Sequence, residues 1–126
     1  MGKKLAIDFN SQTPIFQQIV NEVERQILIG TLKEEDFLMS VREFAIANTI
    51  NPNTVAKAYQ ILQTMDLVES VRGKGLKVKR LKEKTAAARR DDIIAERIKD
   101  LLQLGDSLKI NAEDIIELIK SIGRKK

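Results

Sequence analysis

Side chains that can hydrogen-bond to the edges of DNA bases recur on one face of a helix predicted over residues 52–65. Asn53, Lys57 and Gln60 fall on the same side of a helical wheel, together with the small Ala56. Asparagine and glutamine can pair bidentately with adenine, lysine can donate to guanine, and alanine can pack against a thymine methyl group. The pattern is typical of a face that reads base edges, although a solvated helix face would also be polar.

A basic side chain is expected close to this face. Arg42 lies in the first turn of a second predicted helix, from Ser40 to Asn48. In a helix-turn-helix the first helix crosses a phosphate strand, and a guanidinium suits phosphate or guanine geometry. The alternative for Arg42 is an exposed structural arginine.

A short hairpin follows the residue 52–65 helix. The β-prone runs 67–71 and 76–80 are joined by Arg72, Gly73, Lys74 and Gly75, whose glycines permit a tight turn. Along the second run Lys77 and Lys79 alternate with Leu76 and Val78, so one edge of the hairpin is predicted to be positive. A phosphate clamp is one interpretation, and protection of an edge strand against aggregation is the other.

Capping residues predict where the N-terminal helices begin. Thr13 and Pro14 indicate the N-cap and first position of a helix whose apolar residues recur every four positions up to Gly30. Ser40 with Glu43 forms a capping box, and Asn51 followed by Pro52 is a second cap.

Two further helices are predicted after the hairpin. The first runs over residues 86–104 and is closed by Gly105, and the second follows a cap made by Asn111 and Asp114. Their apolar stripes cannot easily be buried within one chain, so we expect them to pair with a second copy. The residues expected at this dimer interface are Ile94, Ile98, Leu101, Ile115, Ile119 and Ile122.

The order of these elements predicts a mainly α fold with a small β-hairpin wing. Two short helices, a tight turn and a basic hairpin outline a winged helix-turn-helix. We expect residues 1–80 to form this DNA-binding domain, 81–85 to be a linker and 86–126 to be a two-helix dimerisation segment. No internal repeat occurs in the 126 residues.

Composition excludes most enzyme chemistry. The chain has no cysteine and no histidine, which removes thiol nucleophiles, imidazole bases and almost every zinc site. Asp91, Asp92 and Glu96 could group on one helix, but carboxylates without a companion base more often form helix-surface ion pairs. We therefore expect no catalytic residue, no metal site and no cofactor, and the net charge of +4 fits a polyanionic partner.

No apolar run approaches the roughly 20 residues of a membrane span, and the N-terminus lacks a hydrophobic signal core. We therefore expect a cytoplasmic protein with no membrane partner. The two C-terminal helices leave little surface to line an enclosed effector pocket, and no pattern identifies an effector ligand.

The ordered series of motifs resembles the GntR family of bacterial repressors, and its YtrA-like branch in particular. That branch has only two helices after the wing, and here only residues 81–126 remain. The resemblance extends continuously from about residue 14 to residue 79. It is carried by these fragments: PIFQQI at 14–19, GTL at 30–32, SVREFA at 40–45, NPNTV at 51–55 with Ala58 and Tyr59, and GKG at 73–75.

The resemblance implies double-stranded DNA as the partner, a homodimer binding a palindromic operator, and site roles that carry over by position. The positions implied to face DNA are Arg42, Asn51, Asn53, Thr54 and Lys57, with Gly73 and Lys74 at the wing tip. It also implies repression.

Three positions depart from the family pattern. Met39 replaces a proline before the capping serine, Asp66 replaces a glycine after the third helix, and Glu35 and Asp36 occupy the place of another turn glycine. These changes affect local turns and leave the DNA-facing positions intact. A winged helix that has lost DNA binding and serves as a protein-interaction adaptor is the alternative function; the retained basic residues argue against it.

Overall fold

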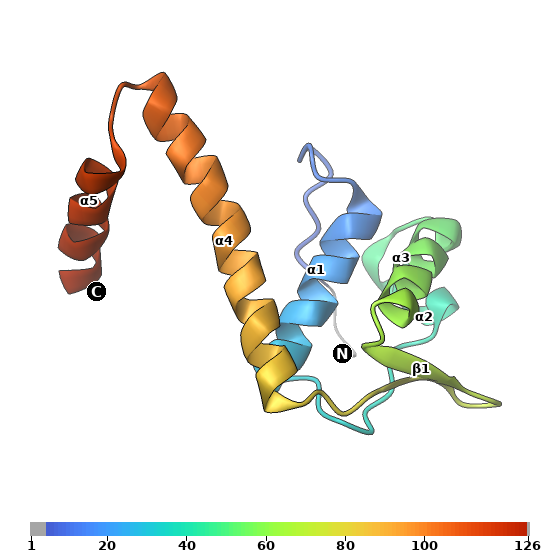
Figure 1. Cartoon of the computed structure of the whole chain (residues 1–126). Coiled ribbons are helices and arrows are strands. Elements are labelled where there is room, and N and C mark those ends of the chain that lie inside the picture. Colours follow the sequence, from blue (N-terminus) through green and yellow to red (C-terminus); the bar gives the residue numbers. More distant parts are fainter. Residues whose placement is uncertain (1–4, 126) are drawn as a thin grey trace. The chain divides into compact units, whose positions relative to one another are not determined.

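The computed structural model describes residues 5–125, which form helices and a two-stranded antiparallel sheet (Figure 1). The chain divides into two compact units, Met1–Lys82 and Glu83–Lys126. The elements are α1 (Ile15–Leu28), α2 (Val41–Asn48), α3 (Pro52–Thr64), β1 (Val68–Val71), β2 (Gly75–Val78), α4 (Glu83–Ser107) and α5 (Ala112–Arg124). The predicted mainly α fold with a hairpin wing is confirmed.

The core of the first unit lies where α1, α2, α3 and the hairpin meet. The four-residue spacing on α1 places Ile19 and Val23 on one buried stripe, and Phe44 of α2 and Leu62 of α3 are also fully buried. Burying an aliphatic or aromatic side chain of this size stabilises a fold by about 1.5–3 kcal/mol. This core holds the helix-turn-helix and its wing in one body.

Local hydrogen bonds set the predicted starts of α2 and α3. The Ser40 hydroxyl accepts from the Glu43 amide at 3.1 Å, and the Asn51 side chain accepts from the Asn53 amide at 2.8 Å. Between the helices Thr49 takes a left-handed conformation, with φ of 55°. This residue ends α2 and turns the chain into α3.

The start of α1 differs from the prediction. Thr13 was expected to be the N-cap, but Pro14 occupies that position and no side chain caps the helix. The side-chain amide of Gln18 donates instead to the carbonyl oxygens of Asp8 and Thr13, both at 2.9 Å. The preceding segment is therefore held by a glutamine of the helix, which a capping pattern does not reveal.

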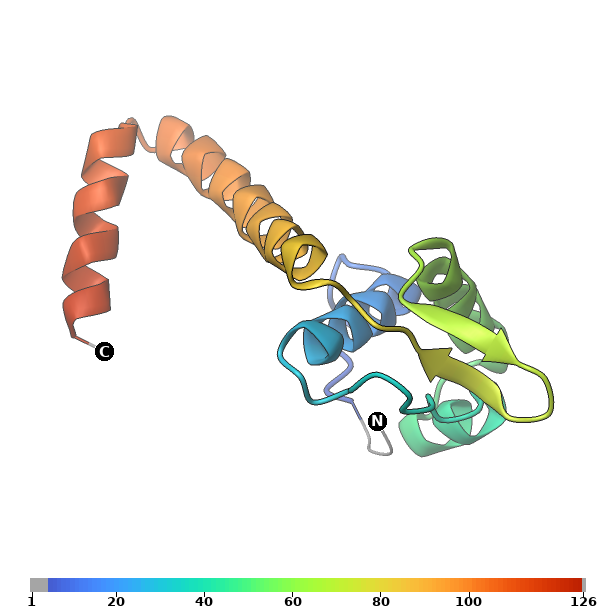
Figure 2. The same ribbon diagram turned by 60° about the horizontal axis from the view of Figure 1, so that its bottom comes forward.

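The wing is an antiparallel hairpin to which a third segment is added. Val68 pairs with Val78, and Val71 pairs with Gly75 at the tip (Figure 2). Phe37 forms an isolated bridge with Lys77, and the Leu38 amide donates to the Leu76 carbonyl at 2.8 Å. The segment leading into α2 thus fixes the hairpin to the helix-turn-helix.

Helix α4 is longer than predicted. It begins at Glu83, within the stretch expected to be a linker, and a carboxylate in the first turn favours a helix N-terminus. The prediction that Gly105 ends the helix is wrong, because α4 continues to Ser107. Lys109, with φ of 59°, makes the left-handed turn, and the Ile110 amide closes it on the Gly105 carbonyl at 2.8 Å.

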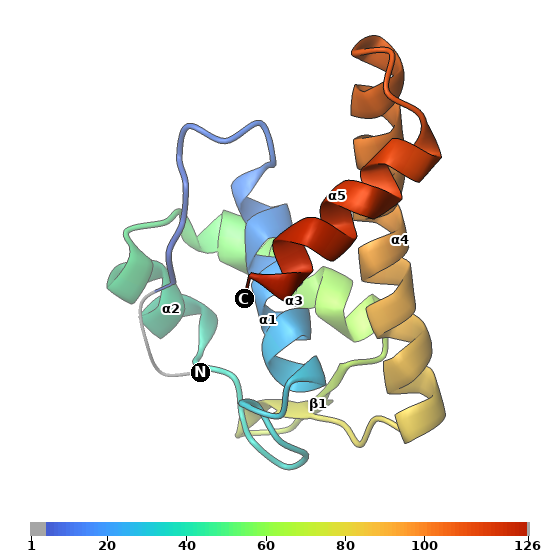
Figure 3. The same cartoon turned by 90° about the vertical axis from the view of Figure 1, so that its left-hand side faces the viewer.

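Gly105 serves helix packing instead. A Cβ at this position would lie 2.7 Å from Cδ1 of Ile115, so the glycine lets α5 approach α4. Asn111 caps α5 as predicted, accepting from the Asp114 amide at 2.9 Å. Helix α5 folds back from the turn after α4 (Figure 3). Among the described residues, no helix is both long and apolar enough to cross a membrane.

Candidate nucleic-acid interface

The two faces of α3 differ as the sequence predicts. Val55, Ala58, Tyr59 and Leu62 are buried against the core. The opposite face is exposed over its whole length, and its members are Asn53, Ala56, Lys57 and Gln60. One side of the helix therefore packs while the other presents hydrogen-bonding groups to the surroundings.

Tyr59 fixes the orientation of α3. Its buried hydroxyl donates to the Met39 carbonyl at 2.7 Å, and its ring meets the edge of the Phe44 ring at a centroid distance of 6.1 Å. Burial raises the pKa of Tyr59 above its usual range, with a smaller contribution from the charge of Glu43. The phenol thus stays protonated and joins α3 to the segment that leads into α2.

Two positions assigned to DNA by resemblance also have a place in the structure of the helix-turn-helix itself. The side-chain oxygen of Asn51 accepts the hydrogen bond that caps α3, so its NH₂ group and one lone pair of that oxygen are left for a partner. Thr54 is half-buried. Asn51 is the N-cap of α3 and Thr54 lies in its first turn, and the roles of both toward DNA remain predictions.

The ammonium of Lys57 has an intramolecular contact that periodicity could not show. Its Nζ lies 3.9 Å from the centroid of the Phe16 ring, in the first turn of α1. A cation over an aromatic face is attracted by the ring's quadrupole. The basic side chain of the exposed α3 face is therefore held at a defined place.

Arg42, Arg72 and Lys74 are exposed basic residues without such partners. Within residues 5–125, no hydrogen bond or ion pair engages their side chains. Gly73, with φ of 78°, forms the tip of the wing between two of them. These guanidinium and ammonium groups are available to phosphates.

The strand lysines of the wing are engaged within the domain. Lys77 lies 3.3 Å from Glu35 and 3.6 Å from Glu69, and Lys79 lies 2.5 Å from Asp66. The hydrogen bonds to Glu35 and Asp66 raise the pKa values of Lys77 and Lys79 respectively. These ion pairs favour a structural role over the phosphate clamp that the alternation of the strand suggested.

This arrangement of an exposed recognition helix beside a wing with free basic groups at its tip has a family match. The family described as "Bacterial regulatory proteins, gntR family" matches residues 15–78, from α1 to the end of β2. The chain belongs to the gntR family. The HTH-type transcriptional repressor YtrA of Bacillus subtilis (strain 168) is 35% identical over 118 residues, covering 94% of this chain and 91% of that protein.

Solved structures agree with this membership. A GntR family transcriptional regulator from Listeria monocytogenes superposes with a TM-score of 0.77 at 31% identity, covering 90% of this chain and 98% of that one. The AraR DNA-binding domain in complex with operator ORX1 has a TM-score of 0.54 at 22% identity, covering 60% of this chain and 96% of that one. The AraR similarity shows a shared fold.

The gntR-family chain is therefore a DNA-binding transcription regulator and not an enzyme. The resemblance to the YtrA-like branch is confirmed by the match to YtrA over nearly the whole chain. Membership also decides between DNA binding and the adaptor alternative, in favour of DNA binding.

The C-terminal unit of this gntR regulator presents the predicted apolar stripes. Ile115 is buried against the α4–α5 turn, with Gly105 beside it. The other predicted interface residues are exposed in the single chain: Ile94, Ile98, Leu101, Ile119 and Ile122. Sequence periodicity missed six further exposed apolar residues of this unit: Ile93, Leu102, Leu104, Leu108, Ile116 and Leu118.

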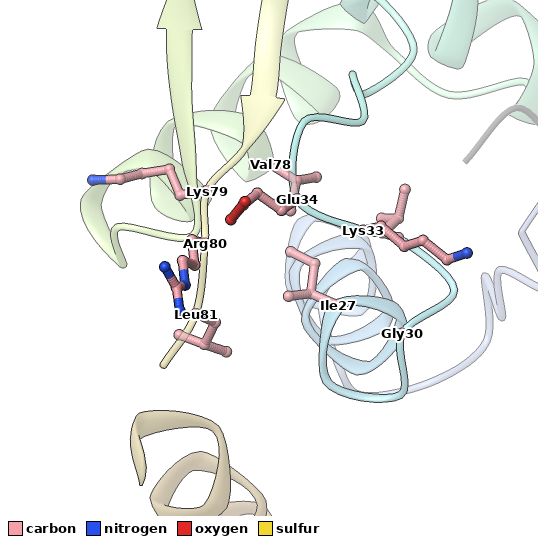
Figure 4. A pocket seen from close by; sticks show the side chains of 9 residues that line it. Ile27, Gly30, Lys33, Glu34, Val78, Lys79, Arg80 and Leu81 are labelled. Atoms are coloured by element: carbon pink, nitrogen blue, oxygen red, sulfur yellow. The ribbon is translucent and has the colours of Figure 1, made fainter. Parts of the chain in front are cut away.

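An open hollow of about 270 Å³ lies in the first unit of the gntR regulator, away from the α3 face. Figure 4 shows Lys79, Arg80 and Leu81 on one side and Ile27, Gly30 and Lys33 on the other. It contains none of the predicted DNA-facing residues. The prediction that the chain lacks an enclosed effector pocket stays a prediction.

The acidic residues of α4 do not form a metal site. No group of three or more His, Cys, Asp or Glu side chains suited to a metal ion occurs in the described part of the chain. Glu96 instead pairs with Lys99 at 3.3 Å on the helix surface. Of the three candidate carboxylates, Glu96 thus acts as a surface ion-pair partner.

Proposed function

We propose that this gntR-family regulator is a repressor that binds a palindromic operator as a homodimer. The observation that carries the proposal is the exposed α3 face, with Asn53, Lys57 and Gln60, in one body with the unpaired cations Arg72 and Lys74 of the wing tip. A recognition helix specifies sequence through base edges while cations at a wing contact phosphates.

Dimerisation is supported by the apolar surface of α4 and α5. Ile94 is 59% exposed, Ile119 54% and Ile122 66%, which is unusual for so many neighbouring large aliphatic side chains on two helices. A second copy of the same surface is the most economical cover, because two-fold dimers are the commonest assemblies. Such a dimer presents two recognition helices to half-sites about 34 Å apart, or a multiple of that.

This proposal divides the chain by role. Residues 1–80 bind DNA, residues 81–85 connect the two parts and residues 86–126 dimerise; residues 1–4 and 126 lie outside the described structure. Repression follows from occupancy of a promoter and is supported by the name of YtrA as a repressor. Because its target is the bacterial chromosome, the protein acts in the cytoplasm.

The dimer is tested on the full chain by sedimentation. Ile98→Glu places a charge on the exposed stripe of α4 and is expected to give a monomer, since an unpaired buried charge is strongly destabilising at an interface. Gln103→Glu, at an exposed position on the side of α4 opposite this stripe, is the matched control and is expected to remain a dimer. A wild-type chain that sediments as a monomer at micromolar concentration would refute the dimer.

The operator is tested by selection from a library of random duplexes. The expected result is an enriched sequence with two-fold symmetry, bound by one dimer. Enrichment of a single asymmetric half-site would contradict the palindrome while leaving DNA binding in place. Repression is then measured with a reporter gene downstream of the enriched sequence, whose output is expected to fall when the protein is present.

A further inference from the structure

Phe16 and Lys57 belong to the two helices that pack most extensively in the first unit. Helix α1 packs against α3 and crosses it at an angle, as Figure 3 shows, and Val23 and Val55 are fully buried in the core that joins them. The register of the helices places the half-buried Phe16 ring next to the exposed face of α3. The position of the ring is therefore fixed by the core.

The contact restricts a side chain that would otherwise be highly mobile. A lysine side chain has a flexible stem of four carbons and a strongly hydrated ammonium, so an exposed lysine samples many rotamers. In this structure Nζ lies 3.9 Å from the ring centroid. A cation–π contact at an exposed site favours the bound rotamer by about two- to five-fold.

The contact leaves donors free for a second partner. An ammonium has three N–H groups, and a ring face covers only one side of it. Lys57 is exposed, so its remaining side faces the surroundings of α3, between Asn53 one turn earlier and Gln60 one turn later. A lysine held in this way can donate to a base without first losing rotamer freedom.

We propose that Phe16 is a positioning residue for base recognition, which holds the ammonium of Lys57 in the orientation that donates to a base edge and so contributes to operator specificity. This inference rests on the proposed function, because it requires a sequence-specific operator. Phe16 itself need not touch DNA. Phe16 acts on the ammonium of Lys57 alone. Its loss is therefore expected to change how strongly the protein prefers one base pair over another at the position that Lys57 contacts.

The experiment uses the full chain and four variants. Phe16→Leu removes the ring while keeping apolar bulk, and Phe16→Tyr keeps the ring as a conservative rescue. Lys57→Met removes the cation, and the double variant Phe16→Leu/Lys57→Met completes the cycle. Each is titrated with the duplex selected by the wild-type chain and with an unrelated duplex of equal length, and thermal unfolding establishes that each variant is folded.

A spectroscopic measurement reports the contact itself. In the free chain with ¹³C-labelled lysine, the ε-methylene protons of Lys57 are expected upfield of those of other lysines because they lie over a ring. Phe16→Tyr is expected to keep this shift and Phe16→Leu to abolish it. An unshifted Lys57 signal in the wild-type chain would overturn the inference without bearing on DNA binding.

The binding data then decide the role. Phe16→Leu is expected to lower the ratio of selected to unrelated affinity about two- to five-fold, to have no further effect when Lys57 is Met, and to be rescued by Phe16→Tyr. An unchanged or increased ratio would overturn the inference, because an increase would show that the ring withholds Lys57 from DNA.

A loss of the affinity ratio on Phe16→Leu that is equally large in the Lys57→Met background would also overturn the inference. If the wild-type chain selects no duplex at all, the proposed function fails first and the inference fails with it.

Discussion

Lys79 places its ammonium 2.5 Å from the carboxylate of Asp66, which joins the wing to the end of the recognition helix. Asp66 has φ of 63°, the left-handed conformation that ends α3. The Leu67 amide closes this turn on the Leu62 carbonyl at 3.1 Å. The family usually has a glycine in this turn. Here Asp66 adopts the same left-handed conformation and is also the ion-pair partner of Lys79.

Substitutions at Asp66 separate these two roles. Asp66→Ala removes the ion pair and keeps a Cβ in the left-handed region, whereas Asp66→Gly removes both the ion pair and that strain. Although glycine also gains freedom in the unfolded chain, the relief of strain is the larger effect, and we expect Asp66→Gly to be more stable than Asp66→Ala by about 0.5–1 kcal/mol. Urea unfolding measures the difference, and an alanine variant as stable as the glycine variant would contradict the assigned turn.

Asn48 is a buried polar residue that connects α2 to the N-terminal segment. Its side-chain oxygen accepts from the Leu5 amide at 2.6 Å, and its NH₂ group donates to the Phe44 carbonyl at 3.0 Å. We expect Asn48→Ala to lower the free energy of unfolding by about 1–3 kcal/mol, because buried backbone groups lose their partners. The exposed Asn21→Ala is the control, expected to change it by less than about 0.5 kcal/mol.

Because Tyr59 is buried, we predict that the free energy of unfolding depends on pH in the alkaline range. In the unfolded chain its phenol loses a proton near pH 10, whereas burial keeps it protonated in the fold. The unfolded state then binds fewer protons, so the free energy of unfolding falls as pH rises above about 10.

The matching variant is Tyr59→Phe. At neutral pH it is expected to be less stable by about 1 kcal/mol, because the Met39 carbonyl loses its donor. Above about pH 10 the difference from the wild type should narrow, since only the wild type has this titration. Lys77 and Lys79 titrate in both proteins and cancel in the comparison. A constant difference from about pH 8 to about pH 11 would argue against a buried, protonated phenol.

Gly105 and Gly123 make a matched pair in the C-terminal unit. A Cβ at Gly105 would lie 2.7 Å from Cδ1 of Ile115 and 3.0 Å from the Ile110 carbonyl, whereas one at Gly123 would meet nothing within 4 Å. We expect Gly105→Ala to cost about 1–3 kcal/mol and to weaken dimerisation, and Gly123→Ala to be neutral or stabilising by up to about 1 kcal/mol. Thermal unfolding and sedimentation of both variants test this, and equal behaviour would contradict the close packing of α5 on α4.

Features that depend on neighbouring residues were predictable from the sequence. The caps at Ser40, Asn51 and Asn111 each need one side chain and an amide two or three residues away. The two faces of α3 follow from helical periodicity, because the buried positions recur on one side. These local rules also define the hairpin between two short β-prone runs.

Features that depend on distant residues were not predictable. The bridge from Phe37 to Lys77 and the contact of Lys57 with Phe16 join segments that are far apart in the chain. Gly105 was predicted to end α4, since glycine commonly follows a helix. Its actual role is to leave room for the side chain of Ile115, a contact between two helices that the sequence does not show. Tertiary packing decides such positions, and a single sequence does not display it.

Sequence-specific DNA binding by the α3 face and the wing tip is tested most directly by measuring affinity as a function of salt. Fluorescence anisotropy of the selected duplex and of an unrelated duplex gives both affinities for the wild-type chain, for Arg72→Ala/Lys74→Ala and for the control Lys77→Ala/Lys79→Ala. We predict a wild-type preference of about 10³-fold or more for the selected duplex.

The same titrations give the slope of log affinity against log salt. This slope is predicted to become shallower by about 0.9 for each phosphate contact that the Arg72→Ala/Lys74→Ala variant no longer makes. It is predicted to change much less in the control, whose lysines are already ion-paired. A wild-type chain that binds both duplexes equally, or with an affinity that salt does not alter, would contradict sequence-specific binding through these groups.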